Sequence, residues 1–300
     1  MNYKEYKVIL DTDIGDDIDD AFALAVAIKS KCDLVAITTV YKNTLARGKQ
    51  AAQLISLSKL DIPVFIGEST PLNGIITPFP NEQGDLTKIL PCQYDNEMEQ
   101  FKIGFNASQE IVRLAKTYKN KLVIVTIGPL TNLAKALEID PSIKDDIAAV
   151  FDMGGCYSKV LPEWNVLCDV EAYDKVFKSN LSFYGVGLDM TMQCPLDGSL
   201  FDILRQSDDP ITQKIFVWFD RWMDYFHFEK SVLHDPLTVC SLIDSSICKF
   251  EEKFVKVIID GELRSAIETS DEPCDGYNKI NVAVSVNKEK FYDLIEKYLS

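Results

Sequence analysis

Hydrophobic positions along the first two thirds of the chain form short runs separated by longer amphipathic segments. Apolar or β-branched runs predict strands at residues 8–10, 34–40, 64–66, 122–127, 148–153 and 184–188. The intervening patterns predict helices at residues 21–28, 45–58, 108–116 and 130–137. Apolar strands that alternate with helices indicate a parallel sheet covered by helices. We therefore expect an α/β protein with an open, mostly parallel, Rossmann-like central sheet.

The last third of the chain has a different pattern. Residues 212–229 predict an aromatic-rich helix that packs on the core or on another subunit. Residues 254–259, 263–268 and 280–286 are β-rich, and Asn287 is a plausible N-cap for a final helix. Residues 72–98 lack periodicity and predict a long loop. With no recognisable linker, residues 1–300 are expected to form a single domain with an additional β-rich C-terminal segment.

Composition and charge exclude several classes of protein. The 300 residues are 47% hydrophobic and 26% charged, which is ordinary for a globular chain and argues against disorder. The net charge of −15 argues against a nucleic acid or an anionic membrane as partner, because phosphates would be repelled. The eight cysteines form no C-x-x-C pair, and no signal peptide or membrane-spanning run is recognisable. These features favour a cytoplasmic protein.

An acidic turn, VILDTDIGDDIDDAFALA, contains the most informative residues of the sequence. Six aspartates fall within ten positions, between a predicted strand and a predicted helix: Asp11, Asp13, Asp16, Asp17, Asp19 and Asp20. A helix dipole contributes under about 1 kcal/mol per charge, which does not offset the repulsion of so many carboxylates. A hard cation such as Ca²⁺, with six to eight oxygen ligands, does offset it. In α/β sheets ligands bind at the carboxyl ends of strands, where this turn lies.

Three other interpretations of the turn can be weighed. One is a solvated turn whose aspartates cap the helix. Another is an EF-hand, which fails because position six from Asp11 is Asp16 rather than glycine and position twelve is Phe22 rather than glutamate. The third is a haloacid dehalogenase-type phosphatase, which the D-x-D after a first strand resembles. In that enzyme Asp11 would be the nucleophile.

Further motifs follow the turn in a fixed order. They are AITTVYKNT from Ala36, IGPLTNLA from Ile127, MGG from Met153, EWN from Glu163, VGLDMT from Val186 and HDPL from His234. Together with the acidic turn they resemble the nucleoside hydrolases of the inosine-uridine preferring type over nearly the whole chain. The resemblance implies an open, mostly parallel α/β fold, a bound Ca²⁺, a ribonucleoside substrate and assembly as a homodimer or homotetramer.

The resemblance also implies roles for individual residues. Asp13 would ligate calcium and deprotonate the attacking water. The further calcium ligands would be Asp20, Asp235 and the backbone carbonyl of Ile127. Asp19 would bind the ribose 2′-hydroxyl, and His234 would lie near the leaving base. The remaining ribose contacts would come from Asn43, Glu163 and Asn165.

The sequence departs from the family pattern in the turn and in two loops. Ile14 replaces a proline, and two extra residues separate Gly15 from Asp19, so Asp16 or Asp17 is an alternative for one of the assigned roles. Residues 72–98 lack a histidine-bearing segment, and the loop after Gly155 lacks an asparagine. Base preference and recognition of the 5′-hydroxyl are therefore open. Tyr225 and His227 are candidates for the wall that faces the base, because their helix precedes HDPL.

The chemistry explains why such a site needs these residue types. Cleavage of an N-glycosidic bond develops positive charge on the sugar and negative charge on the departing base. Carboxylates stabilise the first, and an imidazole suits the second near neutral pH. We expect hydrolysis of ribonucleosides to ribose and a free base. The alternatives are a weakly active or non-catalytic riboside-binding relative and the Mg²⁺-dependent phosphatase considered above.

Overall fold

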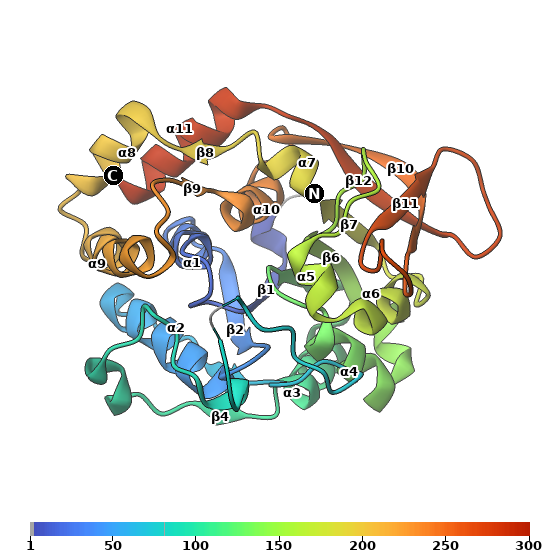
Figure 1. The fold of residues 1–300 in the computed structure, drawn as a ribbon, viewed down its shortest axis with the longest axis horizontal. Helices are drawn as coiled ribbons and strands as arrows, with labels where there is room; N and C mark the ends of the chain where they lie inside the picture. The colour runs from blue at the N-terminus through green and yellow to red at the C-terminus, as the bar shows by residue number, and fades with distance from the viewer. Residues whose placement is uncertain (1–2, 81) are drawn as a thin grey trace.

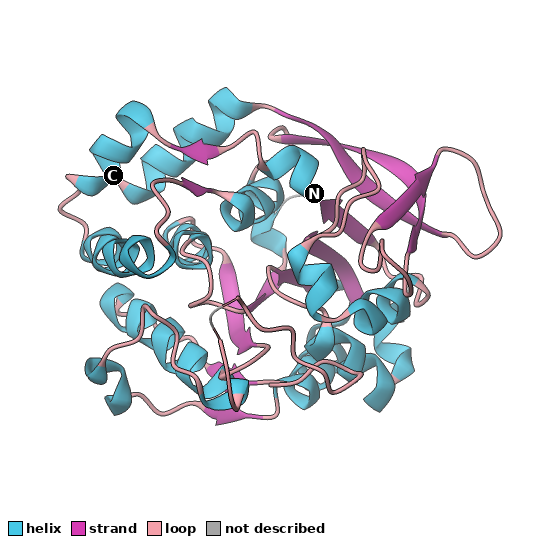
Figure 2. Ribbon diagram, in the orientation of Figure 1, coloured by secondary structure: helices cyan, strands magenta, loops and turns pink. Residues whose placement is uncertain are grey.

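The computed structural model describes residues 3–80 and 82–300, and its centre is a ten-stranded sheet (Figures 1 and 2). The spatial order is β11-β10-β12-β7-β6-β5-β1-β2-β3-β4. The strands are β1 (Lys7–Thr12), β2 (Asp33–Thr39), β3 (Val64–Ile66), β4 (Gly104–Phe105), β5 (Leu122–Thr126), β6 (Ile147–Met153), β7 (Phe183–Val186), β10 (Cys248–Val257), β11 (Ile267–Ser270) and β12 (Asn278–Val286).

Neighbouring strands from β4 across to β12 pair in parallel, and β10 is antiparallel to both β12 and β11. This arrangement confirms the predicted fold class, with the β-rich C-terminal segment added to one edge of the sheet. The predicted strand at residues 263–268 is wrong in position, since β11 begins only at Ile267. Gly261 and Ser265 have φ values of 81° and 77°, so the chain turns where the pattern predicted an extended strand.

Helices cover both faces of the sheet, as Figure 2 shows. One face carries α1 (Asp19–Lys29), α2 (Thr44–Ser58), α9 (Pro210–Phe226), α10 (His234–Ile243) and α11 (Lys288–Leu299). The other carries α3 (Ala107–Tyr118), α4 (Thr131–Ile139) and α6 (Val170–Phe177). Successive residues of β1 alternate between the two cores, with Val8 and Leu10 in the first and Ile9 in the second.

The shorter elements include α5 (Trp164–Cys168), α7 (Leu188–Thr191), α8 (Gly198–Arg205) and the two-stranded ribbon of β8 (Pro195–Leu196) and β9 (Ser231–Val232). Short 3-10 helices lie at Tyr3–Glu5, Asn96–Gln100, Lys119–Lys121 and Pro141–Asp145. The loop predicted at residues 72–98 is largely irregular and holds the short 3-10 helix Leu86–Lys88. Among the residues described, no helix is both long and apolar enough to cross a membrane.

The strand order reverses beside β1. The chain moves outward from β1 through β2, β3 and β4, and then returns to place β5 on the other side of β1. At such a switch point the connections leave in opposite directions, so a crevice opens beyond the carboxyl ends of the two strands. Asp13 follows β1 and Ile127 follows β5, and this topology therefore brings the two predicted site residues to the same crevice.

Asn132 ties the strands together beneath that crevice. Its Nδ2 donates to Asp11 Oδ1 at 2.7 Å and to the carbonyl of Thr39 at 3.1 Å, and its Oδ1 accepts from the Glu68 N–H at 2.8 Å. A Cβ on Gly67 would lie 2.2 Å from the Asn132 amide, so only glycine fits this approach. A single buried amide thus links β1, β2 and the segment after β3.

We expect Asn132→Ala to lower the free energy of unfolding by about 2–4 kcal/mol, because it leaves buried polar groups without partners. Urea unfolding monitored by circular dichroism measures this loss. Asn96→Ala serves as control, because Asn96 is exposed and its variant should stay within about 0.5 kcal/mol of wild type. Equal stability of the two variants would contradict the assigned role of Asn132.

Candidate active site

A cavity of about 500 Å³ opens at the switch point of the sheet. Its lining combines two kinds of side chain. The acidic turn and the start of α10 supply polar groups, namely Asp13, Asp16, Asp17, Asp19, Asp20, His234 and Asp235. Three segments supply aromatic side chains, namely Phe79, Trp164, Trp222, Tyr225, Phe226 and Phe228. Such a cavity has the size and mixed lining of a small-molecule site.

Three buried carboxylates meet inside this cavity. Asp19, Asp20 and Asp235 each offer an oxygen, and these oxygens lie within 4.8 Å of one another. The Asp235 N–H donates to Asp19 Oδ2 at 3.0 Å, so the HDPL motif is bonded directly to the acidic turn. The fold thus joins two motifs that are 216 residues apart in the chain.

Helix starts position the three carboxylates. α1 begins at Asp19 and α10 begins at His234, so Asp19, Asp20 and Asp235 all lie in first helical turns. Thr12, the last residue of β1, donates its hydroxyl to Asp20 Oδ1. The N-terminal ends of both helices favour negative charge, but only modestly for each carboxylate.

Burial makes this cluster electrostatically costly without a cation. Desolvation raises the pKa of Asp13 and Asp19 to about 7. It raises the pKa of Asp20 and Asp235 well above the ordinary range, and neighbouring carboxylates raise both further. Several oxygen ligands in a buried site are what a hard divalent cation requires. The aspartate cluster can therefore bind a metal ion.

Asp13 and Ile127 lie together at the junction of β1 and β5. A Cβ on Gly128 would be 2.7 Å from Asp13 Oδ1, so the glycine allows the carboxylate to approach the strand end. The Ile127 carbonyl accepts a long hydrogen bond of 3.4 Å from Asn165 Nδ2. Asp13 and Ile127 both line the cavity. The three-carboxylate cluster contains Asp19 instead of Asp13, although Asp19 was predicted to bind the ribose.

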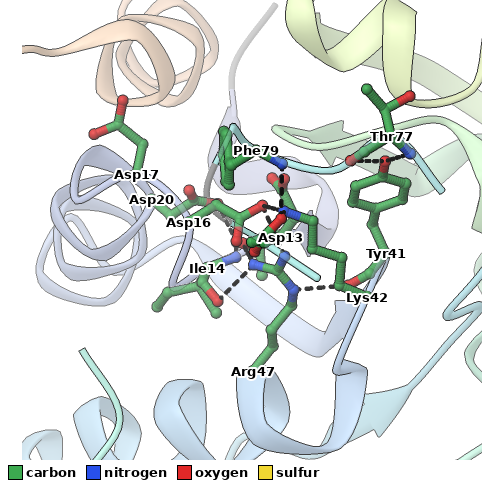
Figure 3. Close-up of polar contacts among 12 residues, drawn as sticks. Asp13, Ile14, Asp16, Asp17, Asp20, Tyr41, Lys42, Arg47, Thr77 and Phe79 are labelled. Carbon is green, nitrogen blue, oxygen red and sulfur yellow. Dashed lines mark hydrogen bonds and ion pairs between the residues drawn. The ribbon is translucent and has the colours of Figure 1, made fainter. Parts of the chain in front are cut away.

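The structure separates the remaining aspartates of the turn. Asp11 is buried outside the cavity lining, where it accepts hydrogen bonds from Thr38 and Asn132. Asp16 Oδ2 pairs with Arg47 Nη2 at 3.0 Å, as Figure 3 shows. Asp17 lines the cavity, and burial together with the Asp19 charge raises its pKa to about 7. The metal-competent cluster thus uses Asp19 and Asp20 rather than the two inserted aspartates.

Glu163 and Asn165 line the cavity and also hold its backbone in place. Glu163 caps α5, with Oε1 accepting from the Asn165 N–H at 3.1 Å and Oε2 from the Gly155 N–H at 3.0 Å. Asn165 Nδ2 donates to the Met153 carbonyl at 3.0 Å. The EWN and MGG motifs are therefore bonded to each other at one wall of the cavity.

His234 is oriented by a residue that the sequence analysis did not assign. Its Nδ1 lies 2.7 Å from Thr191 Oγ1, at the end of the VGLDMT motif. Burial lowers the pKa of the His234 imidazole. The motif itself was the available signal, but only the fold shows that its threonine reaches the histidine 43 residues later.

Two predicted wall residues lie at the cavity, and one predicted ribose contact does not. Tyr225 and His227 line the cavity at the end of α9, and both are exposed. Asn43 lines a smaller neighbouring cavity, and its side chain caps α2 by accepting from the Ala46 N–H at 3.1 Å. The structure thus brings together every predicted site residue except Asn43.

Comparison with known proteins gives the family. The family model described as "Inosine-uridine preferring nucleoside hydrolase" matches residues 8–293. An enzyme of that description from Crithidia fasciculata is 29% identical over 307 residues, which cover 96% of each chain. A pyrimidine-specific ribonucleoside hydrolase from Salmonella typhimurium is 28% identical, with 97% of each chain covered. The chain belongs to the nucleoside hydrolase family, which confirms the resemblance seen in its motifs.

Solved structures agree with this assignment. A plant nucleoside hydrolase, PpNRh1, superimposes with a TM-score of 0.83 at 26% identity, covering 98% of this chain and 99% of the other. An inosine-guanosine nucleoside hydrolase shares the fold, with a TM-score of 0.81 at 22% identity over 98% of each chain. Both comparisons span the sheet and the helices that form the cavity.

The raised pKa values predict a pH-dependent response to calcium. Because the folded carboxylates keep their protons up to about pH 7 while unfolded ones ionise from about pH 4, the metal-free protein loses stability as pH rises between these values. A bound cation needs ionised ligands, so its stabilisation grows with pH. Calcium chloride should therefore raise Tm more at about pH 8 than at about pH 5.5. At a hundredfold excess over Kd, a bound cation adds about 2.7 kcal/mol to the free energy of unfolding.

Differential scanning fluorimetry measures these Tm shifts. Asp235→Asn should abolish the response to calcium, while Asp202→Asn, on an exposed face of α8, should retain it. A calcium response that is equal at both pH values, or that survives in Asp235→Asn, would contradict the site.

Proposed function

We propose that the protein hydrolyses the N-glycosidic bond of ribonucleosides to ribose and a free base, with Ca²⁺ as its cofactor. The observation that carries this proposal is the buried carboxylate cluster of Asp19, Asp20 and Asp235, inside a cavity at the switch point of a nucleoside hydrolase fold. The relatives support it as well, since the Crithidia and Salmonella proteins are both nucleoside hydrolases.

The donor set supports calcium as the metal. Asp13, Asp20, Asp235 and the Ile127 carbonyl would hold the ion, and Asp19 shares the carboxylate cluster with Asp20 and Asp235. All are oxygen donors, which suit Ca²⁺ better than a softer metal. When bound, the cation supplies positive charge that keeps these carboxylates ionised, and it orients water and the ribose diol.

We assign the chemical roles to the chain's own residues. Asp13 accepts the proton of the attacking water, and the surrounding carboxylates stabilise the oxocarbenium-like transition state. His234, held by Thr191, faces the departing base as hydrogen-bond donor. Asp19 binds the 2′-hydroxyl, which favours ribosides over 2′-deoxyribosides. The proposed remaining contacts are Glu163 and Asn165 for the ribose and Tyr225 with His227 for the base, while Asn43, which caps α2 outside the main cavity, is given no contact.

A second candidate function is riboside binding without efficient turnover. The observations that favour it are the lengthened turn and the position of Asn43 outside the main cavity. The phosphatase alternative is not retained, because its nucleophile, Asp11, lies outside the cavity lining and the chain matches the nucleoside hydrolase family over residues 8–293.

We also propose one domain, a homodimer or homotetramer, and a cytoplasmic location. One sheet takes strands from both ends of the chain, which supports a single domain. Exposed apolar side chains such as Phe105 and Ile75 would favour self-association. Sedimentation velocity at micromolar concentration distinguishes the assemblies from a monomer.

The direct test is incubation with inosine, uridine, adenosine and cytidine in calcium buffer, followed by an assay for reducing sugar. Turnover of one or more ribosides is expected, with slower turnover of the matching 2′-deoxyriboside. Binding in calorimetry without hydrolysis over hours would select the second candidate function. If the protein neither binds nor hydrolyses any of these ribosides, both candidate functions are rejected.

Asp13→Ala should lower kcat by about 10²–10⁴-fold, because it removes the group that accepts the proton of water. Steady-state kinetics on the best riboside measures the loss. Circular dichroism should show an unchanged fold, and Asp202→Asn should keep the wild-type rate. A near-normal rate for Asp13→Ala would refute its assigned role.

Thr191→Val should slow hydrolysis of natural ribosides by about 10–100-fold, because the His234 ring loses its fixed orientation. Thr191→Ser keeps the hydroxyl and should stay near wild type. Nitrophenyl riboside provides the control substrate, because nitrophenolate leaves without help from an acid. Equal losses on both substrates would show that Thr191 supports the fold rather than the leaving group.

A further inference from the structure

Lys42 connects the acidic turn to a segment whose residues Phe79 and Pro80 line the cavity. We call that segment the strap and define it as residues 77–80 with Glu82. The Lys42 side chain is 3% exposed, and its Nζ lies 2.8 Å from Glu82 Oε2 and 3.4 Å from Asp16 Oδ2. A buried cation held between two carboxylates from different segments fixes those segments relative to each other.

The same ammonium also lies on an aromatic ring of the cavity wall. Lys42 Nζ is 3.8 Å from the centroid of the Phe79 ring, and the Phe79 N–H donates to Glu82 Oε2 at 2.8 Å. Phe79 stacks on Trp164 with centroids 4.6 Å apart and planes 7° apart. Both rings line the cavity. A cation–π contact is stronger when it is desolvated, so Lys42 holds Phe79 as well as its charged partners.

The backbone before this contact adopts an unusual conformation. Tyr41 and Lys42 have φ values of 68° and 56°, which non-glycine residues rarely adopt in succession. The Tyr41 hydroxyl accepts from the Thr77 N–H at 2.7 Å and donates to the Thr77 carbonyl at 3.0 Å. Figure 3 shows the two consecutive side chains reaching the strap.

Arg47 stabilises the backbone conformation of Tyr41 and Lys42. Its Nε donates to the Tyr41 carbonyl at 2.7 Å, its Nη1 to the Ile14 carbonyl at 3.1 Å, and its Nη2 pairs with Asp16 at 3.0 Å. Arg47 and Lys42 thus both pair with Asp16, and of the two Lys42 also contacts Glu82 and the Phe79 ring. Simple neutralisation of the inserted acids would not require Lys42 to contact the strap.

We propose that Lys42 is a positioning residue that clamps the strap to the acidic turn and so holds Phe79 as a fixed wall of the substrate cavity. This inference rests on the proposed function, because the clamp is expected to increase the affinity for ribosides. Lys42 contacts none of the three clustered carboxylates and acts on Asp13 only through its charge, so we expect its loss to change riboside affinity while calcium affinity changes little.

The kinetic test compares Lys42→Met, which keeps the length of the side chain and removes its charge, with Lys42→Arg. On the riboside that wild type hydrolyses fastest, Lys42→Met should raise KM about tenfold with kcat within about threefold. Lys42→Arg should recover most of the affinity, because it keeps both the charge and the ring contact. Lys49→Met is the matched control, since Lys49 lies on α2 and pairs with Glu99.

Calcium titration by calorimetry should give the same Kd for wild type, Lys42→Met and Lys49→Met. An unchanged KM in Lys42→Met overturns the proposal. A rise in KM that is matched by an equal loss of calcium affinity overturns it too, because the residue would then support the metal site. If Lys42→Met does not fold, Glu82→Gln removes only the strap end of the clamp and should raise KM in the same way.

Hydrogen exchange of the calcium-loaded protein gives a readout that needs no activity. The peptide that covers the strap should exchange faster in Lys42→Met than in wild type or Lys49→Met, with no change across α1. Equal exchange in all three proteins contradicts the clamp. If wild type hydrolyses no riboside, the proposed function is rejected but the clamp is not. Hydrogen exchange of the strap in the three proteins still decides whether Lys42 holds it.

Discussion

The repulsion among buried carboxylates is the constraint around which this structure is arranged. Asp19, Asp20 and Asp235 are each at most 4% exposed, and their oxygens share one small volume. Such a cluster persists in a folded protein only where protons or a cation neutralise it. The acidic turn lies at the carboxyl end of the central strand β1. The first turn of α10 brings the carboxylate of Asp235 to it. The cation site is therefore a product of the fold's topology.

The lengthened turn intensifies this constraint, and the protein compensates for it locally. Asp16 and Asp17 bring further negative charge to a turn that is already acidic. Arg47 on α2 and Lys42 just after β2 are 1% and 3% exposed, and both pair with Asp16 of the turn. Asp16 is held by these cations, so it lines the cavity without joining the cluster. Asp19 and Asp20 are consequently the aspartates of the turn that meet Asp235 in the cluster.

Several side chains at this site serve both the fold and the cavity. Glu163 accepts backbone N–H groups at the start of α5, and Asn165 donates to the end of β6. The aromatic helix α9 divides its residues in the same way. Trp218 and Phe219 are buried in the core, as predicted, while Tyr225 and Phe226 reach the cavity. Substitutions here will change stability and substrate affinity together, which is why matched control variants are needed.

The sequence by itself determined the fold class, most strands and helices, the acidic turn and the family, because these depend on local periodicity and on motif order. Asn287 caps the last helix as predicted, accepting from the Lys290 N–H. Only the tertiary structure decided which distant groups meet. The Asp235–Asp19 bond, the Thr191–His234 contact and the Lys42–Glu82 pair join segments whose separation no periodicity encodes. Asn43 shows the limit of a motif, because its side chain satisfies the start of α2 instead of facing the cavity. Strand order and packing set these distances, and both arise from the whole chain.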